Sequence, residues 1–133
     1  MDDLGLAEAR ARVRQIEGAD VVMCAFDYQV HLSLRREHEA DQVLQLATSF
    51  ELLVDGTTHT IDPTELGDHV APALRLFMRS VESATIDEAR TLVIRFRPTA
   101  TLTISPDLAY EAWQLNDARG LRLVCHSVRF WIG

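Results

Sequence analysis

The chain has 133 residues, of which 47% are hydrophobic and 25% charged, and this composition is typical of a globular protein of one domain. Twenty acidic residues against thirteen basic ones give a net charge of −7, which disfavours a nucleic-acid partner because such partners are bound through a basic surface. No stretch stays apolar over the 18 or more residues that a membrane-spanning helix requires, so we expect no membrane association.

Neither the N-terminus nor the cysteines carry a targeting or redox signature. Residues 1–18 begin with two aspartates where a secretory signal peptide is positively charged, so we expect a cytoplasmic protein. Cys24 and Cys125 lie far apart in apolar stretches and lack the Cys-x-x-Cys spacing of zinc or redox sites. Two buried free thiols are the simplest interpretation.

The first third of the chain changes from a helical pattern to a strand pattern. Residues 6–18 carry apolar side chains at loosely helical spacing and end at Gly18, which predicts a short N-terminal helix or an irregular arm. Residues 20–34 are rich in β-branched and aromatic side chains with period-two alternation. They predict a strand with a bend near Asp27.

The next segment reads as strands that lead into a hairpin. Apolar positions between residues 42 and 54 predict one or two strands. Asp55-Gly56 is a tight-turn dipeptide between apolar runs, and it predicts a hairpin that returns through residues 57–61.

Residues 62–65, Asp-Pro-Thr-Glu, have the signature of a helix start. Asp62 can accept a hydrogen bond from a free backbone amide, Pro63 suits the first helical position, and Glu65 completes a capping box. Apolar residues then recur every three or four positions, at Leu66, Val70, Leu74 and Phe77. We therefore expect one mid-chain helix packed on a sheet.

The remaining chain returns to strand patterns separated by short polar turns. The apolar or alternating stretches are residues 80–87, 90–97, 100–104, 110–115, 121–126 and 128–132. Strands joined by short turns, with one helical interruption, predict an α+β fold. We expect an antiparallel sheet curled around the mid-chain helix, with a short N-terminal helix or arm, in a single domain of residues 1–133.

The sequence contains none of the common phosphate-binding, nucleophile-elbow or zinc-protease motifs. The histidines are dispersed, and the best candidate for a metal site, His59 and His69 with Asp62 and Asp68, reads more simply as a solvated loop. We predict no catalytic residues, no metal site and no cofactor. The sequence favours a protein that is not an enzyme, without excluding one that uses the dispersed histidines and carboxylates.

An aromatic cluster, residues 110–116 (YEAWQLN), is the most distinctive stretch. Taken as a strand, it places Tyr110, Ala112 and Gln114 on one face and Glu111, Trp113 and Leu115 on the other. One interpretation puts Trp113 and Leu115 in the core, with Tyr110 partly exposed and Glu111 at the rim. The other takes Tyr110, Glu111 and Trp113 as a partner-binding surface, because aromatic residues are favoured interface anchors.

The same residues carry a family resemblance. Pro106-Asp107 followed by residues 110–113 resembles a set of small, largely uncharacterised actinobacterial proteins with a Tyr-Glu-Ala-Trp-x-Leu signature, over residues 20–126. The chain departs from them after Cys125, where it lacks a Pro-Gly-Gly turn, and at residues 97–100. The resemblance implies a domain rich in antiparallel sheet, offers no catalytic residues to carry over, and suggests an immunity-like role against polymorphic toxins.

We therefore expect a non-catalytic protein-interaction module, with an immunity-like protein that neutralises a basic toxin as its most concrete form. The acidic surface would steer a basic partner toward it. The alternative is a small-molecule binding domain with a pocket between sheet and helix, lined by Trp113, Phe77, Phe96 and Tyr28. A homodimer is also consistent with the sequence, through an apolar strand at residues 128–133 lying at a sheet edge.

Overall fold

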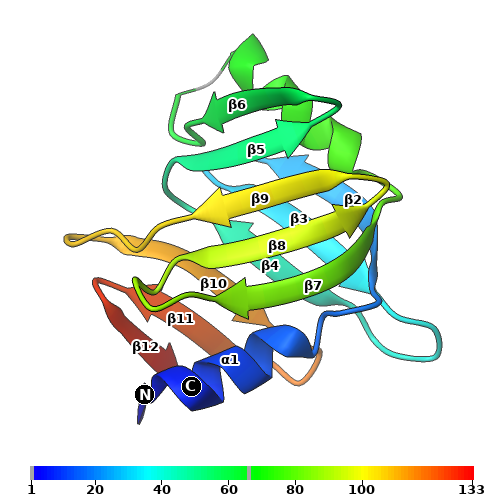
Figure 1. Ribbon diagram of the computed structural model, residues 1–133. Coiled ribbons are helices and arrows are strands. Elements are labelled where there is room, and N and C mark those ends of the chain that lie inside the picture. The colour runs from blue at the N-terminus through cyan, green and yellow to red at the C-terminus, as the bar shows by residue number, and fades with distance from the viewer. Residues whose placement is uncertain (1, 66) are drawn as a thin grey trace.

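The computed structural model describes residues 2–65 and 67–133, and its elements are almost all antiparallel strands (Figure 1). In chain order they are β1 (Asp2–Leu4), α1 (Leu6–Arg14), β2 (Asp20–Phe26), β3 (Val30–Arg35), β4 (Gln42–Leu46), β5 (Phe50–Val54), β6 (Thr57–Ile61), the 3-10 helix η1 (Asp68–Leu76), β7 (Ser80–Ile86), β8 (Leu92–Arg97), β9 (Ala100–Ile104), β10 (Glu111–Asn116), β11 (Arg122–His126) and β12 (Arg129–Ile132). The strands form one open sheet in the order β1-β12-β11-β10-β4-β3-β2-β7-β8-β9-β5-β6.

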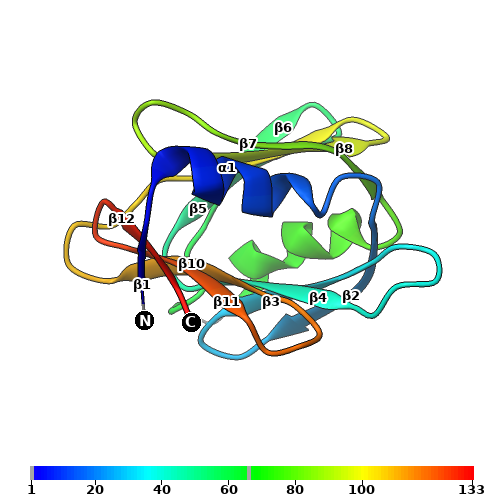
Figure 2. The ribbon, with the colours of Figure 1, turned by 90° about the horizontal axis from the view of Figure 1, so that it is seen from below.

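The sheet is folded over on itself, so that its two halves lie one above the other (Figure 2). One layer holds β12, β11, β10, β4, β3 and β2, and the other holds β7, β8, β9, β5 and β6. The halves join where β2 meets β7, and these strands share one register pair, Asp20 with Ser80. Strands alternate between buried and exposed side chains, as in β5 and β8, and the buried sets form the apolar core.

The predicted α+β fold, with a sheet curled around one mid-chain helix, is wrong. The mid-chain segment forms the 3-10 helix η1, which contains Pro72; proline lacks the N–H that an α-helix needs and collides with the preceding turn. The predicted apolar stripe also fails, because Leu74 and Phe77 are about half exposed (53% and 52%) while Ala73 and Leu76 are buried. Leu66 lies outside the described residues.

The predicted helix start at residues 62–65 is a turn. The Asp62 carboxylate accepts hydrogen bonds from the backbone N–H of Thr64 at 3.0 Å and from its hydroxyl at 2.7 Å, and the Glu65 N–H donates to the Asp62 carbonyl at 3.2 Å. The capping chemistry is therefore present, but it closes a local turn before η1 begins at Asp68.

Helix α1 takes the place of a missing strand along β7. The N-terminal segment is helical over Leu6–Arg14, which resolves the choice between a helix and an arm. The Glu17 carboxylate accepts the Ala84 N–H at 3.0 Å, and the Arg10 Nε donates to the Ile86 carbonyl at 2.7 Å. These side chains satisfy backbone groups on the part of β7 that does not pair with β2 and that would otherwise lack partners. No helix among the described residues is long and apolar enough to cross a membrane.

Two turn predictions have opposite outcomes. The hairpin at Asp55-Gly56 is confirmed, with Val54 opposite Thr57 and a positive φ at both turn residues (52° and 81°). The single bent strand over residues 20–34 is wrong. Residues 27–29 form a second tight turn, in which the Asp27 carboxylate accepts the Gln29 N–H at 2.7 Å, and β2 and β3 pair as a hairpin.

The C-terminal strand is not at an edge of the sheet. β12 pairs with β11 on one side and with β1 on the other, and Phe130 is fully buried. The edge position expected for residues 128–133 is therefore wrong, whereas the homodimer itself stays a prediction. Figure 1 shows the two chain ends side by side.

The Asp55-Gly56 turn generates a prediction about stability. Gly56→Ala should lower the free energy of unfolding by about 1 kcal/mol, because a Cβ is disfavoured at a φ of 81° even though nothing lies within 4 Å of its position. Urea denaturation followed by circular dichroism measures the change. Glu37→Ala, at an exposed turn, serves as the control and should shift stability by less than about 0.5 kcal/mol. Equal stability of Gly56→Ala and wild type would contradict the assigned turn geometry.

Candidate functional site

The aromatic cluster is divided between the surface and the core. Tyr110 precedes β10 and is 69% exposed, and Glu111, the first residue of β10, is half-buried. Trp113 is fully buried and packs on Phe130, with ring centroids 6.2 Å apart. A β-bulge between Glu111 and Trp113 breaks the alternation, so that Ala112 and Trp113 are both buried instead of pointing to opposite faces. Trp113 is thus not available to a partner, whereas Tyr110 and Glu111 are.

Tyr110 and Glu111 border a hollow of about 440 Å³ whose lining includes three acidic residues. We call it the acidic hollow, and it is lined by Ala47, Thr48, Ser49, Asp62, Thr64, Asp107, Tyr110 and Glu111. It lies where the β4–β5 and β9–β10 connections, which both cross from one layer to the other, meet the β6–η1 connection. All its charged lining residues are acidic.

Local hydrogen bonds hold two of these carboxylates in place. Asp107 accepts the backbone N–H groups of Ala109 at 2.8 Å and Tyr110 at 3.0 Å, which fixes the approach of the chain to β10. The hydrogen bonds from Thr64 lower the pKa of Asp62, because they favour its charged form. Asp62 therefore stays ionised at neutral pH, and the hollow presents negative charge on oriented groups.

The described residues give no support to a metal centre. No group of three or more histidine, cysteine or acidic side chains within residues 2–65 and 67–133 is placed to hold a metal ion. His69 instead contacts the Asp62 backbone carbonyl through its Nε2 at 2.9 Å, and His59 lies on β6. Oxygen groups in the acidic hollow can accept hydrogen bonds and attract a cation such as an arginine or lysine side chain.

Both thiols lie in surroundings that suppress nucleophilic chemistry. Burial raises the pKa of Cys24 to about 11 and that of Cys125 to about 12. Cys24 faces the Ala73 carbonyl of η1 at 3.5 Å, and Cys125 lies within β11. Neither thiol is activated by a neighbouring base in this arrangement.

The aromatic pocket expected between sheet and helix is not seen at the predicted residues. Trp113 and Phe96 are buried in the core, whereas Phe77 is 52% and Tyr28 is 70% exposed. The hollows of about 310 to 440 Å³ described for residues 2–65 and 67–133 are lined by none of these four side chains.

Sequence reasoning missed the association between Asp62 and Tyr110. The sequence pattern assigns Asp62 to a helix cap, and no motif marks Thr48 or Ser49 as site residues. The one available cue is Asp107, because an aspartate side chain often accepts the backbone N–H two or three residues further on in a turn.

Comparison with known proteins places most of the chain within one family. A model described as "Family of unknown function (DUF6188)" matches residues 12–128. Neither the curated proteins nor the solved structures contain a significant match to the chain.

The different burial of Tyr110 and Trp113 predicts that substituting them has very unequal effects on stability. Trp113→Ala should lower the free energy of unfolding by about 3–5 kcal/mol, because it removes a fully buried ring from the core. Tyr110→Ala should change it by less than about 0.5 kcal/mol, because the side chain is largely exposed. Urea denaturation of both variants tests the assignment, and comparable losses would contradict it.

The raised thiol pKa values predict slow alkylation. At pH 8 both thiols of the folded protein remain protonated, so iodoacetamide should modify them far more slowly than in the protein unfolded in urea, where thiols titrate near 8.5. Intact-mass spectrometry over time measures the two rates. Rapid single modification of the folded protein would show that one cysteine is reactive.

Proposed function

The chain belongs to the family of unknown function DUF6188, and we propose that it acts as a non-catalytic interaction module that binds basic side chains of a partner protein in the acidic hollow. The observation that carries the proposal is that Asp62, Asp107 and Glu111 all line one hollow, which the exposed residue Tyr110 also borders. Loops that meet on a rigid sheet are common places for binding surfaces.

Arginine is the side chain that suits the acidic hollow best. Its planar guanidinium group offers five N–H donors, which match carboxylate oxygens, and it stacks on aromatic faces. Tyr110 supplies such a face, and the carboxylates of Asp62 and Asp107 are held by their own loops. Because these groups are oriented before a partner arrives, little side-chain freedom is lost on binding.

The charge of the whole chain supports a basic partner. A net charge of −7 attracts a basic protein over distances up to about a Debye length, roughly 8 Å at physiological salt, and raises the association rate. In its most specific form the proposal is an immunity-like protein that neutralises a basic toxin in the cytoplasm. The Tyr-Glu-Ala-Trp-x-Leu stretch would then identify the family members that share this surface. We propose that these members are actinobacterial.

Titration with a defined cationic peptide tests the proposal. The ¹⁵N-labelled protein is titrated with acetyl-Gly-Arg-Arg-Gly-amide, and with the peptide in which citrulline, a neutral isostere, replaces arginine. The arginine peptide should shift the amide signals of Ser49, Tyr110 and Glu111, and the citrulline peptide should not. Glu111→Gln should weaken binding about tenfold, since it removes one charge-assisted hydrogen bond.

Glu37→Gln is the matched control, because it changes the net charge equally at an exposed turn outside the acidic hollow. Its affinity should stay within about twofold of wild type, the small effect expected for a distant exposed charge. Equal weakening by both substitutions, or shifts spread over the whole acidic surface, would show non-specific charge attraction and refute the proposed site.

A further inference from the structure

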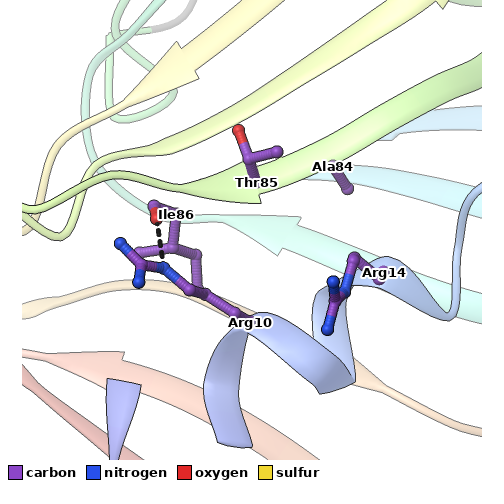
Figure 3. Close-up of a pocket in the computed structure, with 5 residues that line it drawn as sticks. All are labelled: Arg10, Arg14, Ala84, Thr85 and Ile86. Atoms are coloured by element: carbon purple, nitrogen blue, oxygen red, sulfur yellow. Dashed lines mark hydrogen bonds between the residues drawn. The ribbon is translucent and has the colours of Figure 1, made fainter. Parts of the chain in front are cut away.

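The outer face of β10, β11 and β12 carries a hollow of about 310 Å³ that adjoins the acidic hollow. We call it the Trp131 hollow, and it is lined by Glu111, Val124, His126 and Trp131. Glu111 lines both hollows, so the two meet at this residue. The hollow between α1 and β7 differs, because Arg10 of the helix already bonds there to the Ile86 carbonyl (Figure 3).

Strand register places the residues of the Trp131 hollow on one face of the sheet. Glu111 lies opposite His126, and Val124 lies opposite Trp131. Val124 and His126 are two residues apart on β11, so their side chains point to the same face. The alternate positions on β11 and β12 are buried in the core and include Leu123, Cys125 and Phe130. Both helices lie on the inner side of this layer (Figure 2), so the outward face is open to a partner.

The centre of the Trp131 hollow is apolar. Val124 is only 4% exposed although its side chain points outward. Side chains directly opposite each other on neighbouring strands lie about 5 Å apart, and the neighbour of Val124 on β12 is Trp131. Trp131 itself is half-buried, so part of its surface stays accessible beside Val124. An apolar side chain from a partner can pack against this surface.

Charged side chains give the two hollows together an acidic end and a basic end. Asp62, Asp107 and Glu111 lie at the acidic end. Arg129, which is exposed and lies opposite His126 on β12, stands at the other end. A cationic side chain of a partner is attracted to the acidic end and repelled from Arg129. The Trp131 hollow therefore favours a neutral, apolar side chain.

We propose that the Trp131 hollow receives an apolar side chain from the same partner segment that places an arginine in the acidic hollow. This inference rests on the proposed function and makes the partner segment amphipathic as well as basic. β10 and β12 lie roughly 10 Å apart, because neighbouring strands are about 5 Å apart. In an extended segment, alternate side chains point the same way and repeat about every 7 Å. We therefore expect the arginine and the apolar residue two positions apart.

Three peptides test the inference with the full ¹⁵N-labelled protein at constant ionic strength. They are acetyl-Leu-Gly-Arg-Gly-Leu-amide, the same peptide with serine in place of both leucines, and the leucine peptide with citrulline in place of arginine. Leucine stands on both sides of arginine, so that either chain direction can bind. The leucine–arginine peptide should bind about fivefold more tightly than the serine peptide, because part of one leucine side chain leaves water. It should also shift the amide signals of Val124 and Trp131, which the serine peptide should not.

The peptides separate this inference from the proposed function. If the serine peptide shifts the Ser49 and Tyr110 signals and the leucine peptide binds no more tightly, the acidic hollow stands and the present inference is refuted. If neither arginine peptide shifts these signals, both proposals are refuted. If the citrulline peptide binds as tightly as the leucine–arginine peptide, the surface takes apolar peptides without regard to charge, and both proposals are again refuted.

A pair of variants locates the preference for leucine. Trp131→Thr keeps a β-branched residue on β12, and it should remove the preference while leaving the affinity for the serine peptide within about twofold of wild type. Leu53→Thr is the matched control, because it makes a similar change on the exposed face of β5 in the other layer, at a side chain 40% exposed. It should keep the full preference. Loss of the preference in both variants, or in neither, would contradict the inference, and the peptide comparison on the wild type does not depend on either variant.

Discussion

The architecture depends on one constraint, which is that two layers of a single sheet are joined by strands sharing one register pair, Asp20 with Ser80. A buried backbone group without a hydrogen-bond partner destabilises a fold by about 1–3 kcal/mol, so the unpaired flanks of β2 and β7 must be covered. Side chains of α1 and its C-terminal turn cover β7, and the segment ending η1 covers β2, where the Met78 N–H donates to the Val21 carbonyl at 2.7 Å. The two helices and the turns that follow them therefore replace missing strand pairs.

The fold was predictable from sequence wherever neighbouring segments pair. Asp55-Gly56 forms its hairpin because the turn requires two residues that tolerate positive φ, and that requirement is visible locally. Prediction failed where contacts between segments distant in the sequence determine the local structure. The apolar spacing after Asp62 is helical, yet η1 contains Pro72 and packs against β2, β5 and β6, so Ala73 and Leu76 face inward instead of the expected stripe. The turn at residues 27–29 contains neither glycine nor proline, so the sequence pattern predicts only a bend where the chain reverses direction.

The candidate sites were predictable only in fragments. The cluster at residues 110–113 was recognisable by composition, but the bulge that buries Trp113 depends on pairing with β11. The acidic hollow joins Asp62 to Glu111 across nearly 50 residues, and the hydrogen bond from Arg10 of α1 to Ile86 of β7 spans 76. No local pattern encodes such proximity, because it follows from strand order.

The strand order also separates the two layers in time during synthesis. The layer from β7 to β6 is built from one continuous stretch, residues 50–104, so its pairs can form as soon as that stretch has left the ribosome. In the other layer, β10 pairs with β4, which lies far before it in the sequence, and the outermost strand β1 pairs with β12. β1 thus cannot pair until β12 has been translated, and until β10 follows, β2, β3 and β4 form a nascent sheet whose β4 edge lacks its partner.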